Sequence, residues 1–213
     1  MKLNPLLSAS LAAVVLLMAG CASTGYEKAG DTSTTIEKTA RNIHKGNGQI
    51  DSVLFALSSL VNSPEADVKS QFEKFNASVS KLEKLSNDVN EQAAAMQAQG
   101  ADYFRTWDEE LAKIQNEDIR SRSTDRKNIV AARFEKVRVS YAQTKADFVP
   151  FMSDLKDIRT ALATDLTSGG IASIKKVANK ADDNAAPLRK SLTTLEEDFK
   201  ALGISLSSAT PAK

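Results

Sequence analysis

Apolar residues recur every three or four positions over most of this chain, and this spacing limits the fold more than any other feature of the sequence. In residues 68–96, for example, one side of a helix would carry Phe72, Phe75, Val79 and Leu82. A repeat of this kind marks helices that pack lengthwise against one another, whereas strands would alternate every second residue. The pattern therefore predicts an all-α protein.

The apolar repeat is carried by four segments of unequal length. Their apolar positions fall within about residues 34–61, 64–118, 130–162 and 171–202, and the predicted helices are roughly 30, 55, 45 and 30 residues long. The middle two are longer than the outer two, so the outer segments cannot cover the middle pair over its whole length. We therefore expect an elongated antiparallel four-helix bundle, or coiled coil, with a protruding helical hairpin. The uncovered part is predicted near residues 100–140.

The breaks between the segments contain residues that begin or end helices. Ser63 and Pro64 suit an N-cap and the first helical position, and residues 116–124 form a polar cluster. Gly169 and Gly170 can adopt the left-handed conformation that closes many helices. These features predict three turns and an up-down-up-down order.

Three residues inside the segments predict local irregularity. Gly100 precedes a shift in the phase of the second apolar stripe, which indicates a stutter or a hinge. Pro150 and Pro187 lie at equal distances from the third turn and should each bend a helix. In an antiparallel pair the two bends would lie side by side.

The predicted hairpin contains the candidate partner contacts. Trp is favoured at binding hot spots, but Trp107 could instead fill a poorly meshed seam near Gly100. Arg120, Arg122 and Arg126 could touch anionic lipid headgroups or a glycan polymer, or could pair with acidic residues of the opposite helix. The charges predicted to pair across the hairpin are Asp108, Glu109, Glu110, Glu117 and Asp118 with Arg120, Arg122, Arg126, Lys127, Arg133, Lys136 and Arg138.

Residues 1–20 are typical of a secretory signal. Lys2 precedes an apolar stretch that is short for a transmembrane helix, and the stretch ends in Leu17, Met18, Ala19, Gly20 and Cys21. This ending resembles the lipobox of bacterial lipoproteins, in which the Cys is acylated and becomes the new N-terminus. The alternative is an ordinary cleaved signal with a chance cysteine. We expect Cys21 to be the lipidation site.

The residues after Cys21 bear on location and on domain limits. Ala22 and Ser23 follow it, and the resemblance to lipoproteins then implies the outer membrane and a periplasm-facing protein, in a host with two membranes. Residues 21–33 are predicted to form a flexible tether. The bundle domain is placed at residues 34–203, where Thr34 and Glu37 suit a capping box, and residues 204–213 are predicted to be disordered.

Several short stretches resemble a family of bacterial helical proteins. They are Tyr103 to Leu111, the turn from Arg120 to Ser123, Phe148 to Met152, Asp154 to Leu162 and Gly170 to Lys175. Many members of this family carry lipoprotein signals, and the family is known only as a domain of unknown function. The resemblance covers roughly residues 51–206. It implies the helical architecture and no functional site.

Composition argues against several function classes. With 28 Lys and Arg against 27 Asp and Glu, the chain has no basic excess for nucleic acid. Because Cys21 is expected to carry lipid and His44 stands alone, we expect no Cys-His dyad and no Ser-His-Asp triad, and a single His excludes a His-rich metal site. We therefore expect neither an enzyme nor a cofactor or metal.

Three functions stay open. The first is a lipid-anchored structural or interaction protein of the cell envelope, with a protein or an envelope polymer as partner. The second is a membrane-active helical protein whose hairpin inserts. The third is attachment to peptidoglycan through the C-terminal residue Lys213, as in murein-linked lipoproteins. The sequence indicates no oligomeric state.

Overall fold

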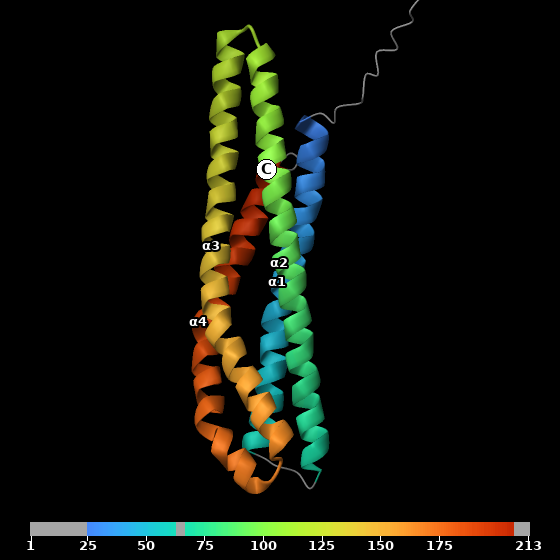
Figure 1. The fold of residues 1–213 in the computed structure, drawn as a ribbon. Helices are drawn as coiled ribbons and strands as arrows, with labels where there is room; N and C mark the ends of the chain where they lie inside the picture. The colour runs from blue at the N-terminus through green and yellow to red at the C-terminus, as the bar shows by residue number, and fades with distance from the viewer. Residues whose placement is uncertain (1–24, 63–66, 207–213) are drawn as a thin grey trace, which may run out of the picture.

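The computed structural model describes residues 25–62 and 67–206, which form four long α-helices (Figure 1). They are α1 (Gly25–Asn62), α2 (Val68–Lys113), α3 (Glu117–Thr164) and α4 (Ser168–Leu206). No strand occurs within these two described ranges. The predicted all-α fold is confirmed.

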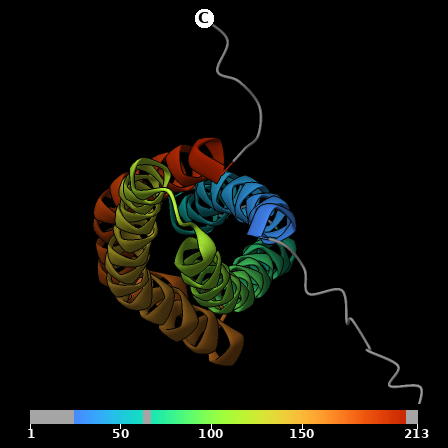
Figure 2. The same ribbon diagram turned by 90° about the horizontal axis from the view of Figure 1, so that it is seen from above.

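Successive helices run antiparallel and form an elongated bundle. α1 packs against α2 and α4, and α3 packs along α4, while α2 and α3 contact each other least (Figures 1 and 2). At one end α2 and α3 continue beyond the other two helices (Figure 1). The four-helix bundle with a protruding hairpin is therefore confirmed. We call residues 108–125, the projecting end of this hairpin, the arm.

Two clusters of buried side chains form the core. The cluster far from the arm includes Phe75, Phe151, Leu155 and Leu188. The cluster near the arm includes Ile43, Met96, Val137 and Phe199. All of them belong to the apolar stripes. Burial of each such side chain is worth about 1.5–3 kcal/mol, so the stripes hold the helices together.

α1 begins earlier than expected. The helix starts at Gly25, so the predicted tether is wrong for residues 25–33, and the capping box at Thr34 is wrong as well. The hydroxyl of Thr34 lies inside the helix and donates to the carbonyl of Gly30 at 3.1 Å. Thr32 is buried, which shows that the packed face extends into this polar-looking stretch.

Other boundaries also differ from the prediction. Asn116 caps α3, whose helix starts at Glu117, so the predicted turn at 116–124 is largely helical. Asp67 caps α2, while Ser63 and Pro64 lie outside the described residues. Residues 204–206 belong to α4 rather than to a disordered tail. The arm is shorter than the predicted 100–140 because α1 and α4 are both longer than expected.

Gly100 is a point of close approach and not a hinge. α2 runs through it without a break, and Gly100 is buried. A Cβ atom there would lie 2.6 Å from Cε1 of the Phe134 ring on α3. The glycine therefore lets the two helices of the hairpin come together where the bundle ends.

Pro150 and Pro187 are both exposed, and α3 and α4 continue through them. Both helices curve along their length (Figure 1). Pro187 lines a surface hollow with Asp147, which lies three residues before Pro150. The two prolines thus occupy the same region of the α3–α4 pair.

Gly169 and Gly170 begin α4 instead of closing α3, which corrects the predicted left-handed cap. α3 ends at Thr164, and the hydroxyl of Thr167 accepts the amide N–H of Gly170 at 3.3 Å. A Cβ at position 170 would lie 2.1 Å from the carbonyl oxygen of Asp165. At position 169 the nearest atom is the Thr167 hydroxyl at 3.6 Å, an ordinary contact.

These two neighbouring glycines give a matched test. Gly170→Ala should lower the free energy of unfolding by about 1–3 kcal/mol, because backbone atoms must move to admit the methyl group. Gly169→Ala should leave stability unchanged or raise it by up to about 1 kcal/mol, as alanine favours helix. Urea denaturation followed by circular dichroism measures both. Equal stability of the two variants would contradict the close approach at Asp165.

Candidate functional site

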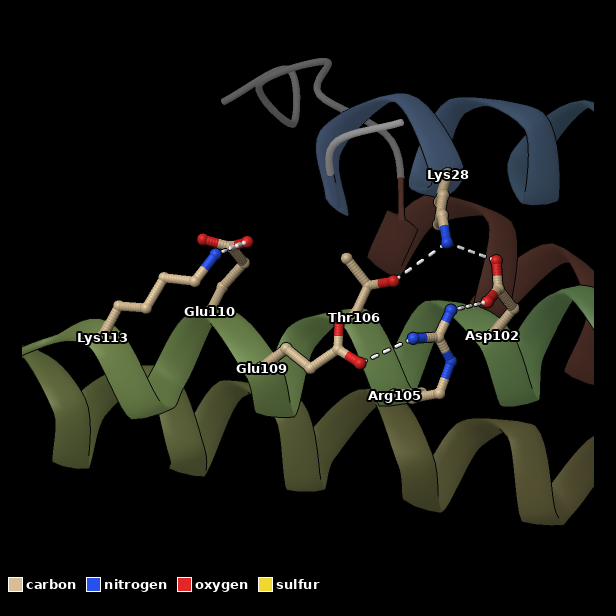
Figure 3. Close-up of polar contacts among 7 residues, drawn as sticks. All are labelled: Lys28, Asp102, Arg105, Thr106, Glu109, Glu110 and Lys113. Atoms are coloured by element: carbon tan, nitrogen blue, oxygen red, sulfur yellow. Dashed lines mark hydrogen bonds and ion pairs between the residues drawn. The ribbon is translucent and has the colours of Figure 1, made fainter. Parts of the chain in front are cut away.

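The base of the arm is fastened to the start of α1 by a polar cluster (Figure 3). The Lys28 ammonium donates to the Thr106 hydroxyl at 2.9 Å and forms an ion pair with Asp102. The Lys28 side chain is only 19% exposed. Hydrogen bonds from Lys28 and then Arg105 hold the pKa of Asp102 below its ordinary value. This carboxylate is therefore charged at neutral pH, and the pair ties α1 to α2.

Aromatic side chains gather at the base of the arm, where they help to join α2 to α3. The rings of Tyr103 and Trp107 lie 5.3 Å apart, and Phe104 meets Phe134 edge-on at 5.2 Å. The indole N–H of Trp107 donates to the Ser123 hydroxyl at 3.0 Å. Trp107 is half-buried, so its geometry favours the seam alternative over a free anchor.

The tip of the arm is a tight, hydrogen-bonded turn. The Asn116 side chain accepts the amide N–H of Ile119 at 3.1 Å. Arg120 donates to the carbonyl of Ile114 at 3.4 Å and pairs with Glu117 at 2.8 Å. Arg120 thus closes the turn, and its charge is already engaged.

Most ion pairs of the hairpin form within one helix, which corrects the predicted pairing between the helices. One pair, Lys127 with Asp108, crosses from α3 to α2. The others link residues three or four apart, where side chains are nearest neighbours on a helix. These pairs are Arg105–Glu109, Lys113–Glu110, Arg120–Glu117 and Arg138–Glu135.

Four cations in the first half of α3 contribute to a surface that we call the basic stripe. Its members are exposed and follow the spacing of one helix face: Arg122, Arg126, Ile129, Arg133 and Lys136. Arg126 donates to the carbonyl of Ser205 at the end of α4. Within the described chain, the other three cations have no ion-pair partner. From the sequence, these cations were expected to pair with acidic residues of the opposite helix. Their spacing of three and four residues could have shown that they lie on one helix face.

The other candidates fall in different places. Cys21 and Lys213 lie outside the described residues, so their roles stay predictions. His44 is exposed and its Nδ1 lies 3.5 Å from a carboxylate oxygen of Glu196. Over residues 25–62 and 67–206 there is no group of three His, Cys, Asp or Glu side chains arranged to hold a metal ion. None of the described helices is long and apolar enough to cross a bilayer.

Comparison with known proteins gives one match. A family model described as "Protein of unknown function (DUF2959)" matches residues 19–199. No curated protein and no solved structure matches the chain. The expected resemblance to a family of unknown function is confirmed.

The bond between Trp107 and Ser123 can be tested directly, since the chain has one tryptophan. Ser123→Ala should shift the fluorescence emission of Trp107 to longer wavelength, because the indole N–H would turn to water. The variant should also lose about 0.5–1.5 kcal/mol of stability. Ser121→Ala, at an exposed position on the same helix, serves as the control. Identical spectra for both variants and the native protein would contradict the bond.

Proposed function

This chain belongs to the family described as "Protein of unknown function (DUF2959)", and we propose that it is a lipid-anchored, non-catalytic lipoprotein of the cell envelope. In this proposal Cys21 carries the anchor in the outer membrane, and the bundle faces the periplasm. The arm, together with Arg122 and Arg126 of the basic stripe, contacts the anionic headgroups of the same membrane. The observation that carries the proposal is the joining of the start of α1 to the base of the arm.

The N-terminal sequence supports the anchor. Residues 1–20 have the features of a secretory signal, and the sole cysteine follows Ala19 and Gly20 at its end. Each buried methylene of an acyl chain contributes about 0.8 kcal/mol, so roughly two or three chains hold a protein firmly on a bilayer.

The arrangement of the helices supports a contact between arm and membrane. Lys28, near the start of α1, touches Asp102 and Thr106 at the base of the arm (Figure 3). From Thr106 to the end of α2 at Lys113 the helix rises about 10 Å. The residues from Cys21 to Gly25 can span about 14 Å at most. A bilayer that holds Cys21 is therefore within reach of the tip of the arm.

The charges near this end support anionic lipid as the partner. Arg122 adjoins Ser123, the partner of Trp107, and Arg126 meets the end of α4, so both lie near the level of the start of α1. Charges within about 10 Å of a membrane surface are not fully screened at 0.1 M salt. Each cation held there contributes about 1 kcal/mol.

The anchor is tested by substitution of the cysteine. Cys21→Ser should abolish incorporation of labelled palmitate and release the protein from the membrane fraction. Cells that express the native chain and a growth-matched vector control provide the references. Native protein recovered from membranes without acyl groups would contradict the proposal.

The lipid contact is tested by charge reversal. The double variant Arg122→Glu, Arg126→Glu should bind vesicles rich in phosphatidylglycerol roughly thirtyfold more weakly, since two cations near the surface are lost. Vesicle flotation measures the binding, which should also weaken with salt. The double variant Lys74→Glu, Lys81→Glu changes two exposed cations on the far half of α2 and should bind like the native protein.

Equal weakening in both double variants would mean that only net charge matters, and would contradict a contact at the arm. Dye release from the vesicles would instead favour the membrane-active alternative.

A further inference from the structure

A cavity lies between the two halves of the core. Its volume is about 250 Å³, and side chains from all four helices line it. Leu82 and Ile50, on its lining, belong to the cluster far from the arm, while Ile43 and Leu195 belong to the cluster near the arm. The apolar stripes therefore do not form one continuous core, and the gap is in the middle of the bundle.

The cavity has a buried floor and an open mouth. Ile43 and Ile50 of α1, Leu82 of α2 and Leu195 of α4 are buried lining residues. The exposed lining residues are Asn90, Lys145 and Val149, which belong to α2 and α3. The cavity thus opens between α2 and α3, which contact each other less than the other neighbouring helix pairs do.

Polar bridges between α2 and α3 lie on both sides of the mouth. On one side, Glu83 pairs with Arg159 at 3.0 Å and with Lys156 at 3.3 Å. On the other side, the Tyr141 hydroxyl donates to the side-chain oxygen of Asn90. Hydrogen bonding from Arg159 lowers the pKa of Glu83, which is therefore ionised at neutral pH. The bridges hold the two helices at a fixed separation around an apolar opening.

The dimensions suit a short hydrocarbon chain. Lining residues on α3 run from Tyr141 to Val149, eight helical rises or about 12 Å. An apolar cavity of about 150 Å³ stays dry and binds benzene, and this one is larger. A water-sized group occupies roughly 30 Å³ in a liquid. A cavity of this volume therefore has room for about eight such groups in a chain.

One charged side chain lines the cavity, and it is a cation at the mouth. Lys145 is exposed there, and no carboxylate in the described part of the chain forms an ion pair with it. The neighbouring Asn90 accepts from Tyr141 through its oxygen, and its side-chain amide also carries two N–H donors. The mouth therefore offers a positive charge and hydrogen-bond donors to an anionic headgroup.

We propose that the cavity binds one single-chain anionic amphiphile of the fatty-acid class. The hydrocarbon tail lies between the two core clusters, and the carboxylate pairs with Lys145 at the mouth. This assignment is independent of the lipid anchor and of the contact between arm and membrane.

The headgroup is tested by calorimetric titration of the purified native protein with decanoate below its micelle concentration, and with decanol as the uncharged probe. Decanoate should bind at one site, and decanol more weakly. Lys145→Glu should weaken decanoate binding at least about tenfold and leave decanol binding unchanged. Lys136→Glu, an exposed position on the same helix that does not line the cavity, should behave as the native protein.

The tail site is tested at a glycine. Gly46 is buried and lines the cavity, and a Cβ there would meet no atom within 4 Å. Gly46→Leu should therefore fill the cavity, raise the melting temperature by removing a helical glycine, and abolish decanoate binding. Gly48 is exposed, and a Cβ there would also meet no atom within 4 Å. Gly48→Leu should therefore also raise the melting temperature but keep decanoate binding.

A loss of binding with a gain in stability cannot come from misfolding. Absence of decanoate binding to the native protein, or undiminished binding to Gly46→Leu, would overturn the assignment. Equal affinity for decanoate and decanol, unaffected by Lys145→Glu, would overturn the anionic class.

Discussion

The burial of one apolar stripe on each helix is the interaction on which this structure depends. Single helices of this length gain little from hydrogen bonds alone, and packing supplies most of their stability. α1 and α4 cover the stripes of α2 and α3 only as far as the base of the arm. Beyond that point the hairpin relies on its own contacts, such as the ion pair of Lys127 with Asp108 and the hydrogen bond from Arg120 to the carbonyl of Ile114. The arm and the bundle are thus stabilised by different means.

The same constraint explains the cavity. A four-helix bundle has a continuous core only where the apolar stripes of all four helices point toward the bundle axis at the same level. Midway along the bundle α2 and α3 separate, and the stripe residues Leu85, Val89, Tyr141 and Phe148 are left half-buried. Polar bridges at Glu83 and Asn90 hold the helices on either side of this gap. The gap in the core, which leaves these side chains half-buried, is thus also the proposed binding site.

The sequence predicted the fold well because helical periodicity is a repeated signal, carried by dozens of positions. Boundaries were less predictable. Thr32 lies in the stretch predicted to be a tether, yet its hydroxyl donates to the carbonyl of Lys28 four residues before it and the residue is buried in the bundle. The prediction of ion pairs across the arm was wrong because oppositely charged residues three or four positions away on the same helix compete for each charged side chain. The cavity could not be predicted from the sequence, because a heptad pattern does not indicate where helices separate.

Both ends of the described chain are attached beside the arm, α1 through Lys28 and α4 through the contact of Ser205 with Arg126. This arrangement has a mechanical consequence. A pull applied between the start of α1 and the arm would pass through the contacts of Lys28 with Asp102 and Thr106. The distant turn between α3 and α4, and the cavity between, would carry almost no tension.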